Sequence, residues 1–110
     1  MKILSWFLNP EINDAAVAIA RSIATRYPPS MDTATVKRIS PSRLEKILED
    51  AYAKAIEFNR NKKMGWFSKA RFGNVFRWEL KELGYTPEFI EVATEGLIVY
   101  LTRKLPQSAS

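Results

Sequence analysis

Three glutamates near the C-terminal end of the chain have a spacing that could bind a cation. Glu91 and Glu95 stand four residues apart, and Glu88 lies three residues before Glu91. If this stretch is helical, side chains at these spacings lie on one face, and hard cations prefer carboxylate oxygens as ligands. A two-metal centre needs further carboxylates from a facing helix, and no such pattern is identifiable. We therefore expect no metal site and interpret the three glutamates as a solvated acidic strip.

Catalytic chemistry has few other residues to work with, because the chain contains no histidine and no cysteine. Histidine is the usual general base and a common metal ligand, so its absence removes the familiar triads and zinc sites. The four tyrosines could donate protons, but no partner base is identifiable. The sequence also has no glycine-rich nucleotide loop and no nucleophile elbow. We therefore predict a protein that is not an enzyme and needs no cofactor. The absence of cysteine permits a reducing compartment, and we expect a cytoplasmic location.

A cluster of basic residues in the second half of the chain could bind a polyanion. The formal net charge is +5, yet residues 60–81 alone contain seven basic residues and one acidic residue. A local basic patch of this kind indicates a phosphate-rich or acidic partner. The predicted surface comprises Arg60, Lys62, Lys63, Arg71, Asn74, Arg77, Trp78 and Lys81. On it the cations would contact phosphates or carboxylates, and Trp78 would stack on a base or anchor a protein interface.

A purely structural interpretation of the same residues is also open. Trp78 could pack under a neighbouring helix or against the N-terminal segment, with the basic residues simply solvated. Lys62 and Lys63 would suit the negative end of a helix dipole. The acidic strip could also pair with the basic face, within one chain or between chains. A helix-turn-helix is less favoured, because a bulky tryptophan in the middle of a groove-facing helix is unusual.

Most of these residues must be positioned by a helix predicted at 69–83. Ser68 is a suitable N-cap, and Gly84 suits the left-handed position that ends a helix. Tyr85 is then expected to fold back on Leu80. The predicted core face comprises Phe72, Val75, Phe76, Leu80 and Leu83.

Three further helices are indicated by apolar residues at helical spacing. Pro10 and Pro87 each suit the first helical position, after an asparagine and a threonine that can act as caps. Another helix begins after Ser40 or at Ser42, which opens a capping-box pattern. The stretch 28–40 shows no clear periodicity and is predicted to be a long connection. The predicted helices span 10–26, 41–62, 69–83 and 87–104.

The last predicted helix is apolar on nearly all sides, which is typical of a central helix or an oligomer interface. Ile98 falls opposite Phe89, and we name Ile98, Val99 and Leu101 as the candidate oligomer surface. Gly96 inside this helix costs about 1 kcal/mol relative to alanine, so a close helix crossing is expected there.

The sequence therefore predicts an all-α fold, a small four-helix bundle-like single domain covering residues 1–110. Residues 1–8 are expected to be a short apolar segment that packs across the bundle, exchanges onto another subunit or inserts at a membrane surface. They are too few to span a membrane, and 106–110 is expected to be a frayed tail. The first functional hypothesis is a non-enzymatic interaction protein, with a protein partner or itself as a homodimer joined through the C-terminal helix. The alternative is a nucleic-acid-binding domain that uses residues 60–81.

Overall fold

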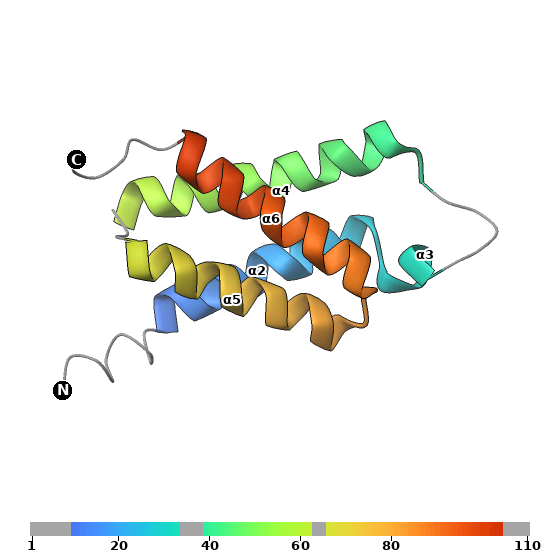
Figure 1. Ribbon diagram of the computed structural model, residues 1–110, viewed down its shortest axis with the longest axis horizontal. Coiled ribbons are helices and arrows are strands. Elements are labelled where there is room, and N and C mark those ends of the chain that lie inside the picture. The colour runs from blue at the N-terminus through green and yellow to red at the C-terminus, as the bar shows by residue number, and fades with distance from the viewer. Residues whose placement is uncertain (1–9, 34–38, 63–65, 105–110) are drawn as a thin grey trace.

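The computed structural model describes residues 10–33, 39–62 and 66–104; the side chains of residues 61, 62, 66, 67 and 104 lie outside this description. Within it the chain forms helices and no strand, which confirms the predicted all-α fold (Figure 1). The helices are α2 (Pro10–Arg26), α3 (Pro29–Thr33), α4 (Pro41–Lys62), α5 (Trp66–Leu83) and α6 (Pro87–Lys104). The proposed roles of residues 1–8 and 106–110 fall outside the described residues.

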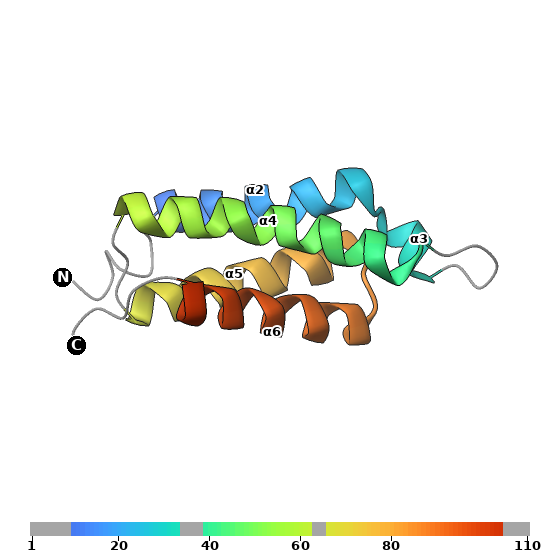
Figure 2. The same cartoon turned by 90° about the horizontal axis from the view of Figure 1, so that it is seen from above.

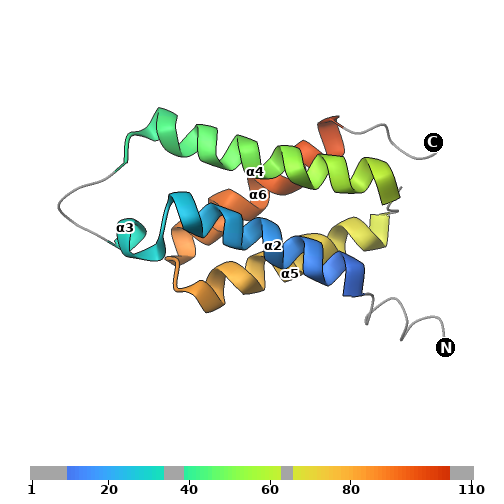
Figure 3. The same ribbon diagram turned by 180° about the vertical axis from the view of Figure 1, so that it is seen from behind.

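The four long helices are arranged in two layers, which Figure 2 shows from above. One layer holds α2 and α4, which run antiparallel, and the other holds the antiparallel pair α5 and α6. Across the layers, α2 packs on α5 and α4 packs on α6. Consequently α4 and α5 lie diagonally across the bundle. The outward face of the α5–α6 layer is turned toward the viewer in Figure 1, whereas Figure 3 shows the α2–α4 layer in front.

The core is built from one apolar stripe on each long helix. On α2, Ala16 and Ala20 are fully buried, and their small side chains allow the close approach of α5. On α5, Phe72, Phe76 and Leu80 are fully buried, as the helical spacing predicted. Val75 is buried as well, and Leu83 is half-buried.

The structure decides between the two predicted caps of α4 and corrects the predicted start of α5. The Ser40 hydroxyl accepts the backbone N–H of Arg43 at 3.3 Å, so Ser40 caps α4 and Ser42 lies inside the helix. Ser68 also lies inside a helix, because α5 begins at Trp66. A serine cap contributes about 1 kcal/mol, which the backbone hydrogen bonds of an additional helical turn can offset. By contrast Thr86 caps α6 as predicted, accepting the N–H of Phe89 at 3.2 Å.

The end of α5 has the geometry that the sequence predicted. Gly84 has a φ of 104°, a conformation that side chains with a Cβ rarely adopt. Its N–H donates to the carbonyl of Lys81 at 3.1 Å, and the N–H of Tyr85 donates to the carbonyl of Leu80 at 3.3 Å. These two bonds define a Schellman motif. The chain therefore reverses at once and places α6 beside α5.

Part of the connection between α2 and α4 is helical. It contains the short helix α3, which Pro29 begins. Asp32 of α3 accepts the hydroxyl of Tyr27 at 3.0 Å and the backbone N–H of Thr86 at 2.8 Å. Tyr85 in turn donates its hydroxyl to the carbonyl of Tyr27 at 2.6 Å. A five-residue helix is too short to show a helical repeat in the sequence, so the helix at Pro29–Thr33 was not among the predicted helices.

Gly96 permits a close approach between the layers, although the group that approaches is a side chain. A Cβ at Gly96 would lie 2.9 Å from Cζ of Tyr52 and closer still to its hydroxyl oxygen. That hydroxyl donates to the carbonyl of Ala93 at 2.8 Å. The aromatic ring of α4 thus lies across α6 at a position where only glycine leaves room.

The α2–α4 layer is joined at its surface by Asp50. Arg26 donates to Asp50 at 2.7 Å, and Lys46 lies 3.1 Å from the other carboxylate oxygen. Hydrogen bonds from Arg26 and then Lys46 hold the pKa of the Asp50 carboxyl below its usual range. The link joins the end of α2 to the middle of α4.

Candidate interaction surface

Helix α5 brings five of the eight residues of the predicted surface onto one outward-facing side. They share a sector of the helix opposite the buried stripe of Phe72, Phe76 and Leu80. The five residues are Arg71, Asn74, Arg77, Trp78 and Lys81. All are exposed except Arg71, which is half-buried.

The structural interpretation expected Trp78 to pack beneath a neighbouring helix, and among the described residues it does not. The other expected contact, with the N-terminal segment, falls outside the described residues. The side chain of Trp78 is 56% exposed, although tryptophan is usually well buried. The guanidinium carbon of Arg71 lies 5.8 Å from the centre of the indole ring, within the range of a cation–π contact. The ring is therefore supported from within its own helix and remains accessible from outside.

Two cations beside Trp78 have no carboxylate partner within the described residues. Glu79 on the same helix pairs with Arg21 of α2 at 2.9 Å, which joins the two layers. Arg77 and Lys81 form no ion pair within 4.0 Å among the residues that the structure describes. Their charges are therefore available to an incoming group.

The remaining members of the predicted basic surface do not join this side of α5. Arg60 is exposed near the end of α4, the helix diagonal to α5. The side chain of Lys62 and the whole of Lys63 lie outside the described residues. Sequence proximity suggested one continuous surface, but the break between α4 and α5 carries Arg60 to a different helix and layer.

The outward side of α6, next to α5, is acidic and partly apolar. Glu88, Glu91 and Glu95 are exposed there, and no ion pair joins α6 to α5 within the described ranges. Val92, which is 62% exposed, follows Glu88 by four residues, and Val99, which is 42% exposed, follows Glu95 by four residues. We call the combined surface the α5/α6 face. It comprises the five α5 residues named above together with Glu88, Glu91, Val92, Glu95 and Val99 of α6.

The candidate oligomer surface of Ile98, Val99 and Leu101 is not one surface in the folded chain. Leu101 is fully buried in the core, so its assignment to an outer surface was wrong. Ile98 is half-buried against α5, where its Cδ1 lies 2.8 Å from the position of a Cβ on Gly73. Only Val99 faces outward. The apolar character of α6 is explained mainly by contacts with α4 and α5 inside the same chain.

Val92 belongs to the α5/α6 face but was not among the candidate surface residues, because it is one of many apolar residues on a helix that is apolar on nearly all sides. Its position did carry a usable indication. It lies four residues after Glu88 and three before Glu95, so helical geometry places all three on the same side.

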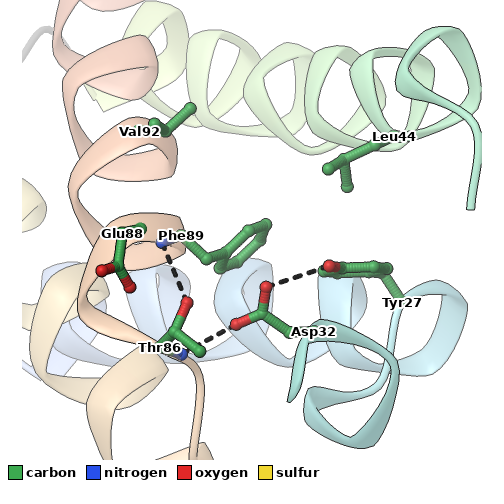
Figure 4. Close-up of a pocket in the computed structure, with 7 residues that line it drawn as sticks. All are labelled: Tyr27, Asp32, Leu44, Thr86, Glu88, Phe89 and Val92. Carbon is green, nitrogen blue, oxygen red and sulfur yellow. Dashed lines mark hydrogen bonds between the residues drawn. The ribbon is translucent and has the colours of Figure 1, made fainter. Parts of the chain in front are cut away.

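A pocket of about 450 Å³ opens at the end of the bundle where α2, α3, α4 and α6 meet (Figure 4). It is lined by Tyr27, Asp32, Leu44, Thr86, Glu88, Phe89 and Val92. Both oxygens of the Asp32 carboxylate accept hydrogen bonds from neighbouring elements, which gives this residue a structural role. The rings of Tyr27 and Phe89 lie 5.2 Å apart at its wall. The lining offers no paired nucleophile and base, so it does not indicate catalysis.

Neither a cluster of metal-binding side chains nor a membrane-spanning helix is found in the described residues. No group of three or more acidic side chains there is arranged to hold a metal ion. None of the described helices is long and apolar enough to cross a lipid bilayer.

Comparisons with known proteins assign the chain to no family. No protein-family model matches it, and searches of curated proteins and of solved structures each found no similar protein.

Proposed function

We propose that the chain is a non-enzymatic protein–protein interaction domain that binds its partner through the α5/α6 face. One observation carries the proposal. The large apolar side chains that stand out as exposed in the described part of the chain are Trp78, Val92 and Val99, and all three belong to this face. Tryptophan and arginine dominate the binding energy of many protein interfaces, and this face has Trp78 in contact with Arg71.

The charge pattern favours a protein partner over a nucleic acid. A polyanion lying on the cations of α5 would also come close to the exposed glutamates of α6, which would repel its phosphates. A protein surface can instead present charges of both signs in matching positions. The absence of cysteine from the chain is compatible with a reducing compartment, and we place the interaction in the cytoplasm.

Position-specific photo-crosslinking in intact cells tests this function. A photoreactive amino acid replaces Trp78 in the full chain, and a control chain carries it in place of Ala53, an exposed residue on the outer side of α4. We expect a discrete crosslinked protein species from position 78 that is weak or absent from position 53. Equal crosslinking at both positions, or none at position 78, would contradict the proposal.

A second candidate function, nucleic-acid binding, is favoured by Arg77 and Lys81, which form no ion pair with any described residue. Fluorescence anisotropy with labelled duplex and single strands, measured from low to physiological salt, distinguishes it. Phosphate binding predicts that log K falls with log salt by about 0.9 for each phosphate neutralised on a duplex. The triple variant Arg71→Ala/Arg77→Ala/Lys81→Ala should reduce that slope. If the wild-type chain does not bind at low salt, this second function is excluded.

A further inference from the structure

We propose that the partner is a second copy of this chain, and that the two α5/α6 faces pair about a two-fold axis. The axis runs parallel to the helices along the seam between α5 and α6, so that α5 of each copy covers α6 of the other. The inference rests on the proposed function and adds the identity and geometry of the partner. The observation behind the inference is that α5 supplies the exposed cations of the face, whereas α6 supplies its exposed glutamates.

A two-fold interface must be complementary to itself, because the same surface occurs on both sides. The α5 side of the seam carries exposed Arg77 and Lys81, and the α6 side carries exposed Glu91 and Glu95. An axis parallel to the helices exchanges the two sides and brings opposite charges together. An axis across the helices would instead place α5 on α5 and set cations against cations, so the charges select the first geometry.

The register of α5 against α6 shows which residues would meet. Gly73 and Ile98 lie at a similar level, because the end of the Ile98 side chain, Cδ1, is 2.8 Å from the position of a Cβ on Gly73. The helices are antiparallel (Figure 1), and each residue advances about 1.5 Å along the axis. Trp78, five residues after Gly73, is therefore level with the residue five before Ile98, next to Val92. The proposed axis preserves these levels, so Trp78 of one copy meets Val92 of the other.

The same counting aligns the charges. Arg77 is close to the level of Glu95, and Lys81 is close to the level of Glu91. In the pair, each cation on one copy therefore faces a glutamate on the other, close to the axis. The apolar contacts lie farther from the axis on both sides. Val92 also lines the pocket of Figure 4, so the indole ring would lie at the mouth of that pocket.

The size of the face indicates a weak, reversible pair. Helices α5 and α6 have 18 residues each, which corresponds to a length of about 27 Å. Two adjacent helices are roughly 20 Å wide, giving a footprint of about 500 Å² on each copy. A total of about 1,000 Å² is at the lower end for specific interfaces. We therefore expect dissociation in the micromolar range.

Charge reversal on each side of the seam tests the geometry. Arg77→Glu/Lys81→Glu makes both helices of the face acidic, and Glu91→Lys/Glu95→Lys makes both basic. Each variant should repel itself and sediment as a monomer. An equimolar mixture of the two variants should pair again. The acidic α5 of the first variant then covers the basic α6 of the second, and the basic α5 of the second covers the acidic α6 of the first. Sedimentation velocity over about 1–300 µM spans the expected dissociation range.

Control variants separate this result from general effects of charge and from misfolding. Arg43→Glu/Lys54→Glu lowers the net charge by the same amount as Arg77→Glu/Lys81→Glu, but at exposed positions on α4. This control should dimerise like the wild type. Circular dichroism of every variant should show the wild-type helix content, because the substituted side chains are exposed.

Two outcomes would overturn the proposal. The first is a wild-type chain that remains monomeric over the whole concentration range. The second is a mixture of the two reversal variants that does not pair although the wild type does, which would place the contact elsewhere.

Failure of self-pairing is distinguishable from failure of the proposed function. In the former case position 78 still crosslinks in cells, to a protein whose mass differs from that of the chain.

Discussion

At the scale of single residues, the packing of the two layers depends on the absence of a side chain at Gly96. Tyr52 extends from α4 across α6 and occupies the space where a Cβ would stand. The neighbouring case, Gly73, differs because the atom that approaches it is the flexible end of the Ile98 side chain. The two glycines therefore form a natural comparison between a fixed aromatic contact and an adaptable aliphatic one.

We predict that Gly96→Ala lowers the free energy of unfolding by about 1 kcal/mol. Overpacking costs about 1–3 kcal/mol, which exceeds the gain of about 1 kcal/mol from better helix propensity. Urea denaturation followed by circular dichroism measures the change. The matched control Gly73→Ala should be close to neutral, because Ile98 can rotate away. The loss at Gly96 should shrink in a Tyr52→Phe background, and an equal loss in both backgrounds would show that Tyr52 is not the cause.

The buried tyrosines predict a loss of stability in alkaline solution. Burial raises the pKa of Tyr52 and Tyr85 above the usual value of 10.0, and both hydroxyls donate to backbone carbonyls. The unfolded chain releases these protons near pH 10, while the folded chain retains them. The contribution of these two tyrosines to the free energy of unfolding should therefore be constant below that pH and should fall as the pH rises above it. In Tyr85→Phe the fall should be smaller than in the wild type, as urea titrations between about pH 8 and pH 11 would show. Equal slopes would contradict the assignment.

At the scale of elements, α3 joins two parts of the chain that are distant in sequence. Its residue Asp32 accepts hydrogen bonds from Tyr27 at the end of α2 and from the backbone of Thr86 at the start of α6. Thr86 also caps α6 through its own hydroxyl. The start of α6, and with it the acidic half of the α5/α6 face, is therefore positioned partly by this short helix.

Asp32→Ala should lower the free energy of unfolding by about 1–3 kcal/mol, because it leaves a partly buried N–H and a hydroxyl without their acceptor. Asp32→Asn retains one acceptor oxygen and should cost less. Thermal and urea denaturation of both variants provide the measurement. If alanine and asparagine cost the same, the hydrogen bonds of Asp32 contribute little to the junction.

At the scale of the whole molecule, helical spacing was sufficient to predict the long helices and most of the buried side of α5. It was insufficient for α6, where apolar residues occur on several sides and only the packing of α4 and α5 decides which are buried. Leu101 is buried by that packing, whereas Val92 and Val99 are left outside. The basic and acidic strips were visible in the sequence. Their placement side by side depends on the tight turn at Gly84 and on the pairing of α5 with α6.

The two-layer arrangement also explains why only part of the basic stretch forms a surface. The connection between α4 and α5 carries the chain to the diagonal position of the bundle, so Arg60 and Arg77 belong to different layers. Charge density along the sequence therefore overstated the size of the basic surface, and the neighbouring glutamates of α6 reduce its net charge further.

A positional map of crosslinking in cells tests most directly whether the α5/α6 face is the contact surface. The photoreactive residue is placed in turn at Asn74, Trp78, Val92 and Val99, and at the exposed control positions Ala18 and Ala53. We predict crosslinks from the four positions on the face and none above background from the two controls. If the partner is a second copy, the product has about twice the chain mass of 12.6 kDa. Crosslinks concentrated at Ala18 or Ala53, or none at any position on the face, would contradict the proposed function.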